Sequence, residues 1–358
     1  MATVEADNID SPAVHVSGIG VVVPEPVSVE DAVRRGLYPA EEAGLHQLGG
    51  AAVAGEVPAP EMALHAARQA FERCGRRPRD IDLLLYADTW HQGPDGWLPH
   101  SHLQRHLVGG DALAVGVRQG CSGMFSALEL AAAYLRASPG RSAALLVTAD
   151  NYGTPLMDRW LVSPGAVLGD AATAVVLTKE PGFARLLAVS SGTVPEAEGL
   201  HRGNEPLFPP GITVGRPMDF RTRADQFRRA ALSRPGGTAA FEAINRRIQE
   251  VARGTAEAAG IKPAEITRVA FTHTSREIFE QKAVRGLGLR PEQATWDFAR
   301  EVGHLGASDQ FAAFDRLLSA GELRPGDHML MIGISPGFTV SAAVLRVSSP
   351  PPWLDGRT

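Results

Sequence analysis

One cysteine in this sequence lies where a nucleophile would be expected. Cys121 sits in Gly120-Cys-Ser-Gly123, between a predicted strand at Leu113–Val117 and a predicted helix at Phe125–Arg136. The positive end of a helix dipole and the unpaired amides of its first turn favour a thiolate, the nucleophilic form of cysteine. The flanking glycines allow a tight turn and the close approach of a substrate. The pattern therefore predicts a cysteine that forms a covalent thioester, with a buried structural cysteine as the alternative.

The second cysteine has a different setting. Cys74 lies at the end of a predicted helix, among three arginines and without a glycine before it. We interpret it as structural or incidental. Two cysteines so far apart do not suggest a disulfide framework or a cysteine-based zinc site, and they fit a reducing compartment.

Composition limits the class of protein. The chain has 358 residues, of which 44% are hydrophobic and 21% charged, and its formal net charge is −5. This length suits two domains of roughly 180 residues each, and the charge gives no global attraction for nucleic acid or anionic membranes. No apolar run approaches the ~18 residues of a membrane span. The polar, acidic start of the chain does not resemble a signal peptide. We therefore expect a cytoplasmic protein that binds neither nucleic acid nor membrane.

Short apolar runs bounded by Gly, Pro and Asp alternate with amphipathic stretches, which is typical of an α/β protein with buried sheets. Val14–Val23 and Asp82–Ala87 are predicted strands, and Glu61–Cys74 is a predicted helix. Two patterns recur later in the chain. Gly75, Pro78, Asp80 and Ile81 are matched by Gly260, Pro263, Glu265 and Ile266, and the segment 169–177 is matched by 337–345. The repetition predicts two similar halves, residues 1–185 with Cys121 and residues 186–358.

Several segments, taken in order, resemble the ketoacyl synthase III branch of the thiolase superfamily. They are residues 17–24, 59–68, 80–84, 120–123, 169–177 and 333–339. The resemblance covers nearly the whole chain. It implies a thiolase-like αβαβα sandwich of two pseudo-duplicated halves and a homodimer.

The resemblance also suggests a partner for Cys121. The family's catalytic histidine opens a His-Gln-Ala-Asn motif at the end of a strand, and Val269-Ala-Phe-Thr-His273 occupies that place here. His273 therefore takes the catalytic role by resemblance. A histidine in a loop at a strand end can also reach a cleft.

The family's third catalytic residue is an asparagine, and this sequence departs from it. Gly303-His304-Leu-Gly306 stands where the family has Gly-Asn-Thr-Ser, and Asp309 follows. His304 could donate a hydrogen bond in place of the asparagine. Asp309 could instead orient His273, giving a Cys–His–Asp triad whose base deprotonates a hydroxyl or an amine. Asp309 could equally be a helix N-terminal residue that interacts only with the helix dipole.

Members of the family with an altered third residue are acyltransferases in natural-product pathways. The resemblance implies a donor that is an acyl carrier protein or an acyl-CoA, with phosphopantetheine or CoA as co-substrate and no permanently bound cofactor. The acceptor would be a sugar or another small hydroxylated molecule. The alternatives are a decarboxylative condensing enzyme that primes a polyketide or fatty chain, and a non-catalytic partner subunit.

Further site residues follow from the same comparison. The backbone amides of Cys121 and Ser335 are the expected oxyanion hole, since Pro336 has no N–H group. Trp90, Trp97 and Leu98 are candidate walls of the acyl pocket. Three histidines lie nearby in the sequence, namely His100, His102 and His106. They do not predict a metal site, because suitable cysteine or carboxylate ligands are missing.

Arginines could receive the donor. The stretch Pro195–Gly237 has weak periodicity, and such a long connection tends to be a lid, a binding loop or a disordered segment. This stretch contains Arg221, Arg223 and Arg228, and Arg276 follows His273. We expect these four arginines to bind a phosphopantetheine phosphate or an acidic carrier protein. A solvated basic loop is the alternative.

Overall fold

A computed structural model describes residues 3–5, 12–208 and 215–354 of the chain. Within these residues, ten strands form one hydrogen-bonded sheet and two short strands, β3 and β4, form a second. The strands are β1 Thr3–Glu5, β2 Val14–Val22, β3 Pro26–Ser28, β4 Gly50–Ala52, β5 Leu83–Ala87, β6 Leu113–Val117, β7 Ala143–Asp150, β8 Ala171–Thr178, β9 Ala184–Thr193, β10 Ile266–Phe271, β11 His328–Ser335 and β12 Thr339–Val347.

Helices cover and separate the strands. The α-helices are α1 Val29–Arg34, α2 Ala40–His46, α3 Ala59–Cys74, α4 Pro99–Leu103, α5 Gly123–Arg136, α6 Gly199–Arg202, α7 Phe220–Leu232, α8 Ala239–Ala258, α9 Arg276–Phe279, α10 Trp296–Val302 and α11 Asp309–Ser319. Short 3-10 or π turns connect many of them. The turn η3, Gly120–Ser122, contains Cys121.

The strand order shows an internal repetition. The large sheet runs β10-β11-β12-β9-β2-β8-β7-β5-β6, and β2 and β9 join its two parts. In the first part, β7 pairs antiparallel with β8 and parallel with β5. In the second part, β11 likewise pairs antiparallel with β12 and parallel with β10. The predicted thiolase-like sandwich of two similar halves is confirmed, while the division after residue 185 stays a prediction.

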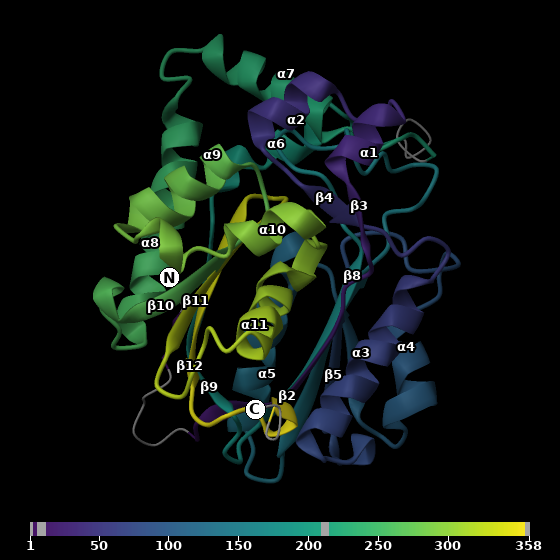
Figure 1. The fold of residues 1–358 in the computed structure, drawn as a ribbon, viewed down its shortest axis with the longest axis vertical. Coiled ribbons are helices and arrows are strands. Elements are labelled where there is room, and N and C mark those ends of the chain that lie inside the picture. Colours follow the sequence, from purple (N-terminus) through teal and green to yellow (C-terminus); the bar gives the residue numbers. More distant parts are fainter. Residues whose placement is uncertain (1–2, 6–11, 209–214, 355–358) are drawn as a thin grey trace.

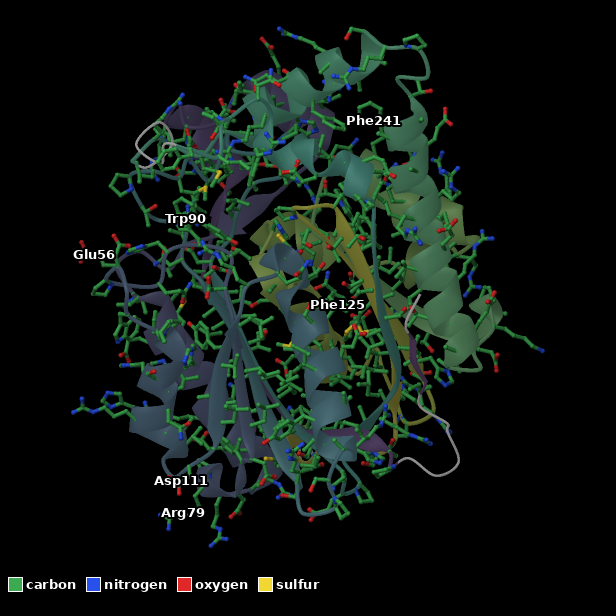
Figure 2. All side chains as sticks on the ribbon, turned by 180° about the vertical axis from the view of Figure 1, so that it is seen from behind. Glu56, Arg79, Trp90, Asp111, Phe125 and Phe241 are labelled. Atoms are coloured by element: carbon green, nitrogen blue, oxygen red, sulfur yellow. The ribbon has the colours of Figure 1, made fainter. Side chains whose placement is uncertain are left out.

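The layers follow from the apolar patterns. Figure 1 shows α5 and α11 between the two parts of the sheet, with α3 and α4 outside one part and α8 outside the other. The eight residues of β7 and the eight of β8 are all buried, as expected for strands covered on both faces. Phe125 of α5, labelled in Figure 2, is 1% exposed and packs in the central core.

The repeated sequence pattern has a local structural basis. Helices α3 and α8 are each followed by a glycine with left-handed φ, Gly75 at 66° and Gly260 at 69°. Each glycine leads to a Pro-initiated 3-10 turn, Pro78–Asp80 or Pro263–Glu265, and then to strand β5 or β10. Glycine and proline favour these turns because glycine tolerates the left-handed region and proline fixes φ.

The segment after β9 is more ordered than its weak periodicity predicted. Two helices, α6 and α7, lie within it, and residues 209–214 are outside the described part. Asp219 caps α7 by accepting a hydrogen bond from the Thr222 amide at 2.9 Å. No residue of either helix is buried, so both helices lie at the surface.

Candidate active site

The conformation of the nucleophile loop, residues 120–123 around Cys121, depends on two glycines. Gly120 has a φ of 54°, in the left-handed region that favours glycine. A Cβ on Gly123 would lie only 2.7 Å from the Cβ of Ala87 in β5, so a side chain there would push α5 away from the sheet. The two glycines place Cys121 in a tight turn before the α5 N-terminus, where it remains partly exposed.

Cys121 is the first member of a hydrogen-bonded chain of three side chains. Its Sγ lies 2.9 Å from Nε2 of His304, and His304 Nδ1 lies 2.7 Å from Oδ2 of Asp309. From sequence we paired Cys121 with His273. In the structure, the imidazole that contacts the sulfur is that of His304. From the resemblance we expected the family's asparagine at this position, so the sequence departure and the sulfur contact fall on the same residue.

The backbone fixes His304 from both sides. The amide of His304 donates to the Val167 carbonyl at 2.7 Å, and the His304 carbonyl accepts from the Gly169 amide at 2.9 Å. A Cβ on Gly169 would lie 2.1 Å from the Val302 carbonyl oxygen. The small residue that begins the segment 169–177 therefore allows the loop of His304 to approach β8 closely.

Asp309 connects both histidines. Its carboxylate accepts from the backbone amides of Leu305 at 2.7 Å and His273 at 2.8 Å, in addition to His304. Nδ1 of His273 lies 3.1 Å from Oδ1 of Asp309. The predicted contact between Asp309 and His273 is therefore present, but Asp309 also holds the second imidazole, which faces the sulfur.

The contacts of His273 favour one tautomer of its neutral ring. Its Nδ1 is 2.8 Å from the Gly303 carbonyl and close to the Asp309 carboxylate, and both of these groups only accept hydrogen bonds. We therefore assign the proton of neutral His273 to Nδ1, which leaves Nε2 as a lone-pair acceptor. Nε2 is buried and has no hydrogen-bond partner among the described residues.

The pKa values of the two imidazoles are shifted in opposite directions. Burial lowers the pKa of His273, although Asp309 and the Gly303 carbonyl oppose this effect. Burial also disfavours protonated His304, but the charges of Asp309 and Cys121 raise the pKa of His304 well above its ordinary value. Burial would raise the pKa of Asp309, yet the two histidines hold it below its usual range. These shifts favour the protonated form of His304 beside the sulfur and the neutral form of His273.

A second buried polar cluster lies against the loop that follows His304. The sequence alone did not reveal this cluster. Asp150 accepts from the amides of Thr89 at 2.8 Å and Trp90 at 2.9 Å, while its Oδ2 has no partner among the described residues. The hydroxyls of Tyr152 and Thr89 lie 2.6 Å apart. Burial raises the pKa of Asp150 to about 7. The sequence feature that could have indicated this cluster is Asp150 itself, an acidic residue at the end of the apolar strand β7.

The C-terminal turn reaches the nucleophile loop. A Cβ on Gly120 would lie 3.0 Å from Pro336 Cδ and 3.5 Å from Ser335 Cβ. Gln119 also donates to the Thr339 hydroxyl at 3.0 Å. The structure therefore brings together the two segments that we expected to supply oxyanion amides, those of Cys121 and Ser335.

The candidate pocket walls differ in their environments. Trp90 is partly buried, and its Nε1 donates to the Thr154 hydroxyl at 2.9 Å. Trp97 and Leu98 are exposed, at 38% and 55%. Figure 2 shows Trp90 above Phe125 and at a distance from the lower end that carries Arg79. Trp90 thus adjoins the Asp150 cluster, whereas Trp97 and Leu98 present apolar surface.

Two of the nearby histidines lie close together, and one of them contacts a carboxylate. His102 contacts Glu61 at 2.9 Å, and its ring lies 4.4 Å from that of His106. In the described part of the chain, no group of three or more histidine, cysteine or acidic side chains could hold a metal ion. Nor is any helix there long and apolar enough to cross a membrane.

All four arginines expected to receive a donor already have carboxylate partners. Arg221 forms a bidentate salt bridge with Glu42, and Arg223 forms a bidentate salt bridge with Glu205. Arg228 contacts Asp225 on the surface at 2.7 Å. Arg276 pairs with Glu280, but its side chain remains 52% exposed.

Known proteins resemble this chain in sequence and in fold. The 3-oxoacyl-[acyl-carrier-protein] synthase III family matches residues 115–195, and the family of its C-terminal part matches residues 256–347. The mycobacterial β-ketoacyl-[acyl-carrier-protein] synthase III of Mycobacterium tuberculosis is 26% identical over 81% of this chain and 81% of its own length. The 3-oxoacyl-[acyl-carrier-protein] synthase III of Aquifex aeolicus has the same fold, with a TM-score of 0.74, 22% identity, and coverage of 93% of this chain and 99% of the other.

A more similar solved structure is that of ChlB3, an acyltransferase. It is 58% identical, with a TM-score of 0.91, and the match covers 96% of this chain and 100% of the other. The chain therefore belongs to the ketoacyl synthase III-like enzymes of the thiolase superfamily.

Proposed function

We propose that this enzyme transfers an acyl group from a carrier-protein or CoA thioester, through acyl-Cys121, to a hydroxyl or amine of a small molecule in secondary metabolism. The observation that carries this proposal is the Cys121–His304–Asp309 chain, with links of 2.9 and 2.7 Å. The similarity to ChlB3 supports the same class of reaction. No bound cofactor is needed, because the thioester itself supplies the activated acyl group.

In the loading step, the Cys121 sulfur attacks the carbonyl carbon of the donor thioester. A cationic His304 stabilises negative charge on the sulfur before attack. As the donor C–S bond breaks, Nε2 of His304 gives its proton to the departing thiolate. The products are acyl-Cys121, a free donor thiol and a neutral His304.

In the transfer step, neutral His304 takes a proton from the acceptor while the acceptor's oxygen or nitrogen attacks acyl-Cys121. The thioester bond then breaks, the sulfur regains its negative charge and His304 is again cationic. Asp309 keeps the Nδ1 proton in place and stabilises the positive imidazole in both steps. The backbone amides of Cys121 and Ser335 are our candidates for stabilising the oxyanion.

The condensing alternative requires different hydrogen bonding. Decarboxylative condensation needs two N–H donors on the thioester oxygen while an enolate forms. Here Nε2 of His304 is directed at the sulfur, and Nε2 of His273 carries no proton in the tautomer assigned above. The arrangement therefore favours acyl transfer to a heteroatom over carbon–carbon bond formation.

The proposed assembly is a homodimer. Strand β6 forms one edge of the large sheet, and its Leu113 and Val115 are 52% and 37% exposed. An edge strand with exposed apolar side chains can pair with a second copy. Trp97 and Leu98, two candidate walls of the acyl pocket, are exposed apolar side chains and are consistent with this assembly.

Intact-protein mass spectrometry tests the function. The enzyme is incubated with acyl and malonyl thioesters of a carrier protein and of CoA, with and without hydroxylated acceptors. We expect an acyl adduct that is absent from Cys121→Ala and disappears when an acceptor is added, with formation of an ester or amide. Release of carbon dioxide with a ketoacyl product would establish the condensing function instead. The absence of any adduct would favour a non-catalytic subunit.

A further inference from the structure

Strand β7 carries polar side chains at its carboxyl end. The strand begins with Ala-Ala-Leu-Leu-Val and ends with Thr148-Ala-Asp150. Alternate residues of a strand project to the same face, and Tyr152 lies two residues further on. Thr148, Asp150 and Tyr152, which we call the polar row, are 0%, 1% and 3% exposed. Buried polar side chains need partners, so the partners of the polar row indicate what it does.

The polar row contacts one short turn, η10, Gly306–Ser308. Thr148 Oγ1 lies 2.7 Å from the hydroxyl oxygen of Ser308. A Cβ on Gly306 would lie 2.6 Å from Oδ2 of Asp150 and 2.6 Å from the hydroxyl oxygen of Tyr152. The polar row therefore contacts both ends of η10 and leaves no room for a side chain at its first residue.

This turn connects two members of the triad. His304 lies two residues before η10, and Asp309 follows the turn as the first residue of α11. A displacement of η10 would therefore move the imidazole and the carboxylate together. Because Cys121 belongs to a different turn, η3, such a displacement would change the 2.9 Å contact between its sulfur and His304.

The polar row is itself held in place by neighbouring segments. Asp150 Oδ1 accepts from the amides of Thr89 and Trp90, and the Tyr152 hydroxyl lies 2.6 Å from Thr89 Oγ1. The Tyr152 amide donates to the buried carboxylate of Asp170 at 2.7 Å. These contacts fix the polar row in the packed interior, so it can act as a rigid support for η10.

The Tyr152 hydroxyl adds no negative charge beside the triad. Burial raises the pKa of Tyr152 well above its ordinary value, and the charges of Asp150, Cys121 and Asp309 act in the same direction. The hydroxyl therefore stays protonated. A neutral group at this position supports the turn without repelling an anionic sulfur or the Asp309 carboxylate.

We propose that Asp150 and Tyr152 are positioning residues for the triad: by closing on Gly306, they hold η10 where His304 meets the sulfur. The proposal rests on the acyl-transfer function, in which His304 exchanges protons with Cys121. Both residues act through the backbone of the turn and not by contact with the substrate. Thr148 supports the other end of the same turn through Ser308.

Alkylation of Cys121 by iodoacetamide tests the proposal without any acyl transfer. The thiolate is the reactive form, so the ratio of the rates at pH 6 and pH 9 reports whether a protonated imidazole supports the sulfur. Peptide mass spectrometry distinguishes this adduct from one on Cys74. We expect Gly306→Ala to lower the ratio roughly 10–100-fold, the cost of a displacement approaching 1 Å. Tyr152→Phe should lower it roughly 2–10-fold, the usual worth of one hydrogen bond.

Two further variants calibrate the ratio. Gly55→Ala is a matched control, because Gly55 has the same φ of 61° as Gly306 but no atom lies within 4 Å of its added Cβ. It should keep the wild-type ratio even where the strained backbone lowers its stability. His304→Ala gives the ratio of a sulfur that has no imidazole partner.

The double variant Gly306→Ala/Tyr152→Phe separates a direct contact from general destabilisation. The added methyl group then meets no hydroxyl, so the loss should be smaller than the product of the two single losses. Tyr152→Phe alone decides the outcome if Gly306→Ala does not fold.

The outcomes distinguish this proposal from the acyl-transfer mechanism. An unchanged ratio in the folded variants, or losses that simply multiply, overturns the positioning role alone, provided that the wild-type ratio depends on His304. A wild-type ratio equal to that of His304→Ala overturns both the positioning role and the Cys121–His304 mechanism.

Discussion

At the residue scale, two imidazoles share one carboxylate, and only one of them contacts the nucleophile. The 2.9 Å contact assigns the exchange of protons with sulfur to His304. His273 is held by Gly303 and Asp309, so we assign it a positioning role on Asp309. The two histidines can therefore be distinguished by substitution.

We expect His304→Ala to slow acylation of Cys121 by roughly 10²–10⁴-fold, the usual cost of losing a general acid–base group. His273→Ala should cost much less, since the sulfur keeps its imidazole partner. Single-turnover adduct formation followed by mass spectrometry measures both. A severe defect in His273→Ala together with a mild one in His304→Ala would return the catalytic role to His273.

The pH dependence of folding reports on Asp150. Burial raises its folded pKa from 3.8 to about 7, so between these values the folded protein binds more protons than the unfolded chain. This carboxyl therefore contributes stability at low pH that is lost as the pH rises toward 7. The shift corresponds to a loss on the order of 4 kcal/mol.

Asp150→Asn removes this titration while keeping an oxygen for the amides of Thr89 and Trp90. We expect the variant to gain stability relative to the wild type between pH 5 and pH 8, as measured by urea unfolding at each pH. A difference that does not change with pH would show that Asp150 ionises normally.

At the scale of elements, the site depends on how closely a helix and a strand approach each other. Because a Cβ on Gly123 would lie 2.7 Å from Ala87 Cβ, α5 fits against β5 only without a side chain there. The same principle operates at Gly169, where the approach positions His304. Small residues at these contacts thus set the geometry of the triad.

Substitution of Gly123 by Val should lower the free energy of unfolding by about 1–3 kcal/mol, the usual cost of overpacking. Gly44→Ala is a matched control, because no atom lies within 4 Å of its added Cβ, and it should be neutral or slightly stabilising. Urea denaturation compares the two variants. Equal effects would mean that the α5–β5 contact does not limit stability.

At the scale of the whole molecule, the two parts of the sheet enclose the central helices and bring segments distant in sequence together. Cys121 comes from the first part, whereas His273, His304 and Asp309 follow β10 and surround α10 in the second. The exposed edge at β6 belongs to the first part. Dimer formation there would extend the sheet across two copies.

Val115→Lys places a charge on this edge strand, where Val115 is 37% exposed. We expect the substitution to convert the proposed dimer to a monomer, because a buried unpaired lysine disfavours the interface. Sedimentation velocity gives the mass of each form. A wild-type monomer, or a variant that dimerises as well as the wild type, would contradict the assembly.

The sequence by itself determined the class of fold, the repetition of its elements and the nucleophile. These features are local: apolar periods set strands and helices, Gly and Pro set turns, and the glycines around Cys121 set its loop. Cys121, His304 and Asp309 could all be chosen from sequence. Their pairing could not.

Only the tertiary structure decided which imidazole contacts the sulfur, which arginines are paired with carboxylates and where Asp150 lies. Each depends on contacts between residues far apart in the chain, such as the 183 positions that separate Cys121 from His304. Sequence spacing does not encode such distances, because side-chain direction and the approach of helices to the sheet together fix which atoms meet.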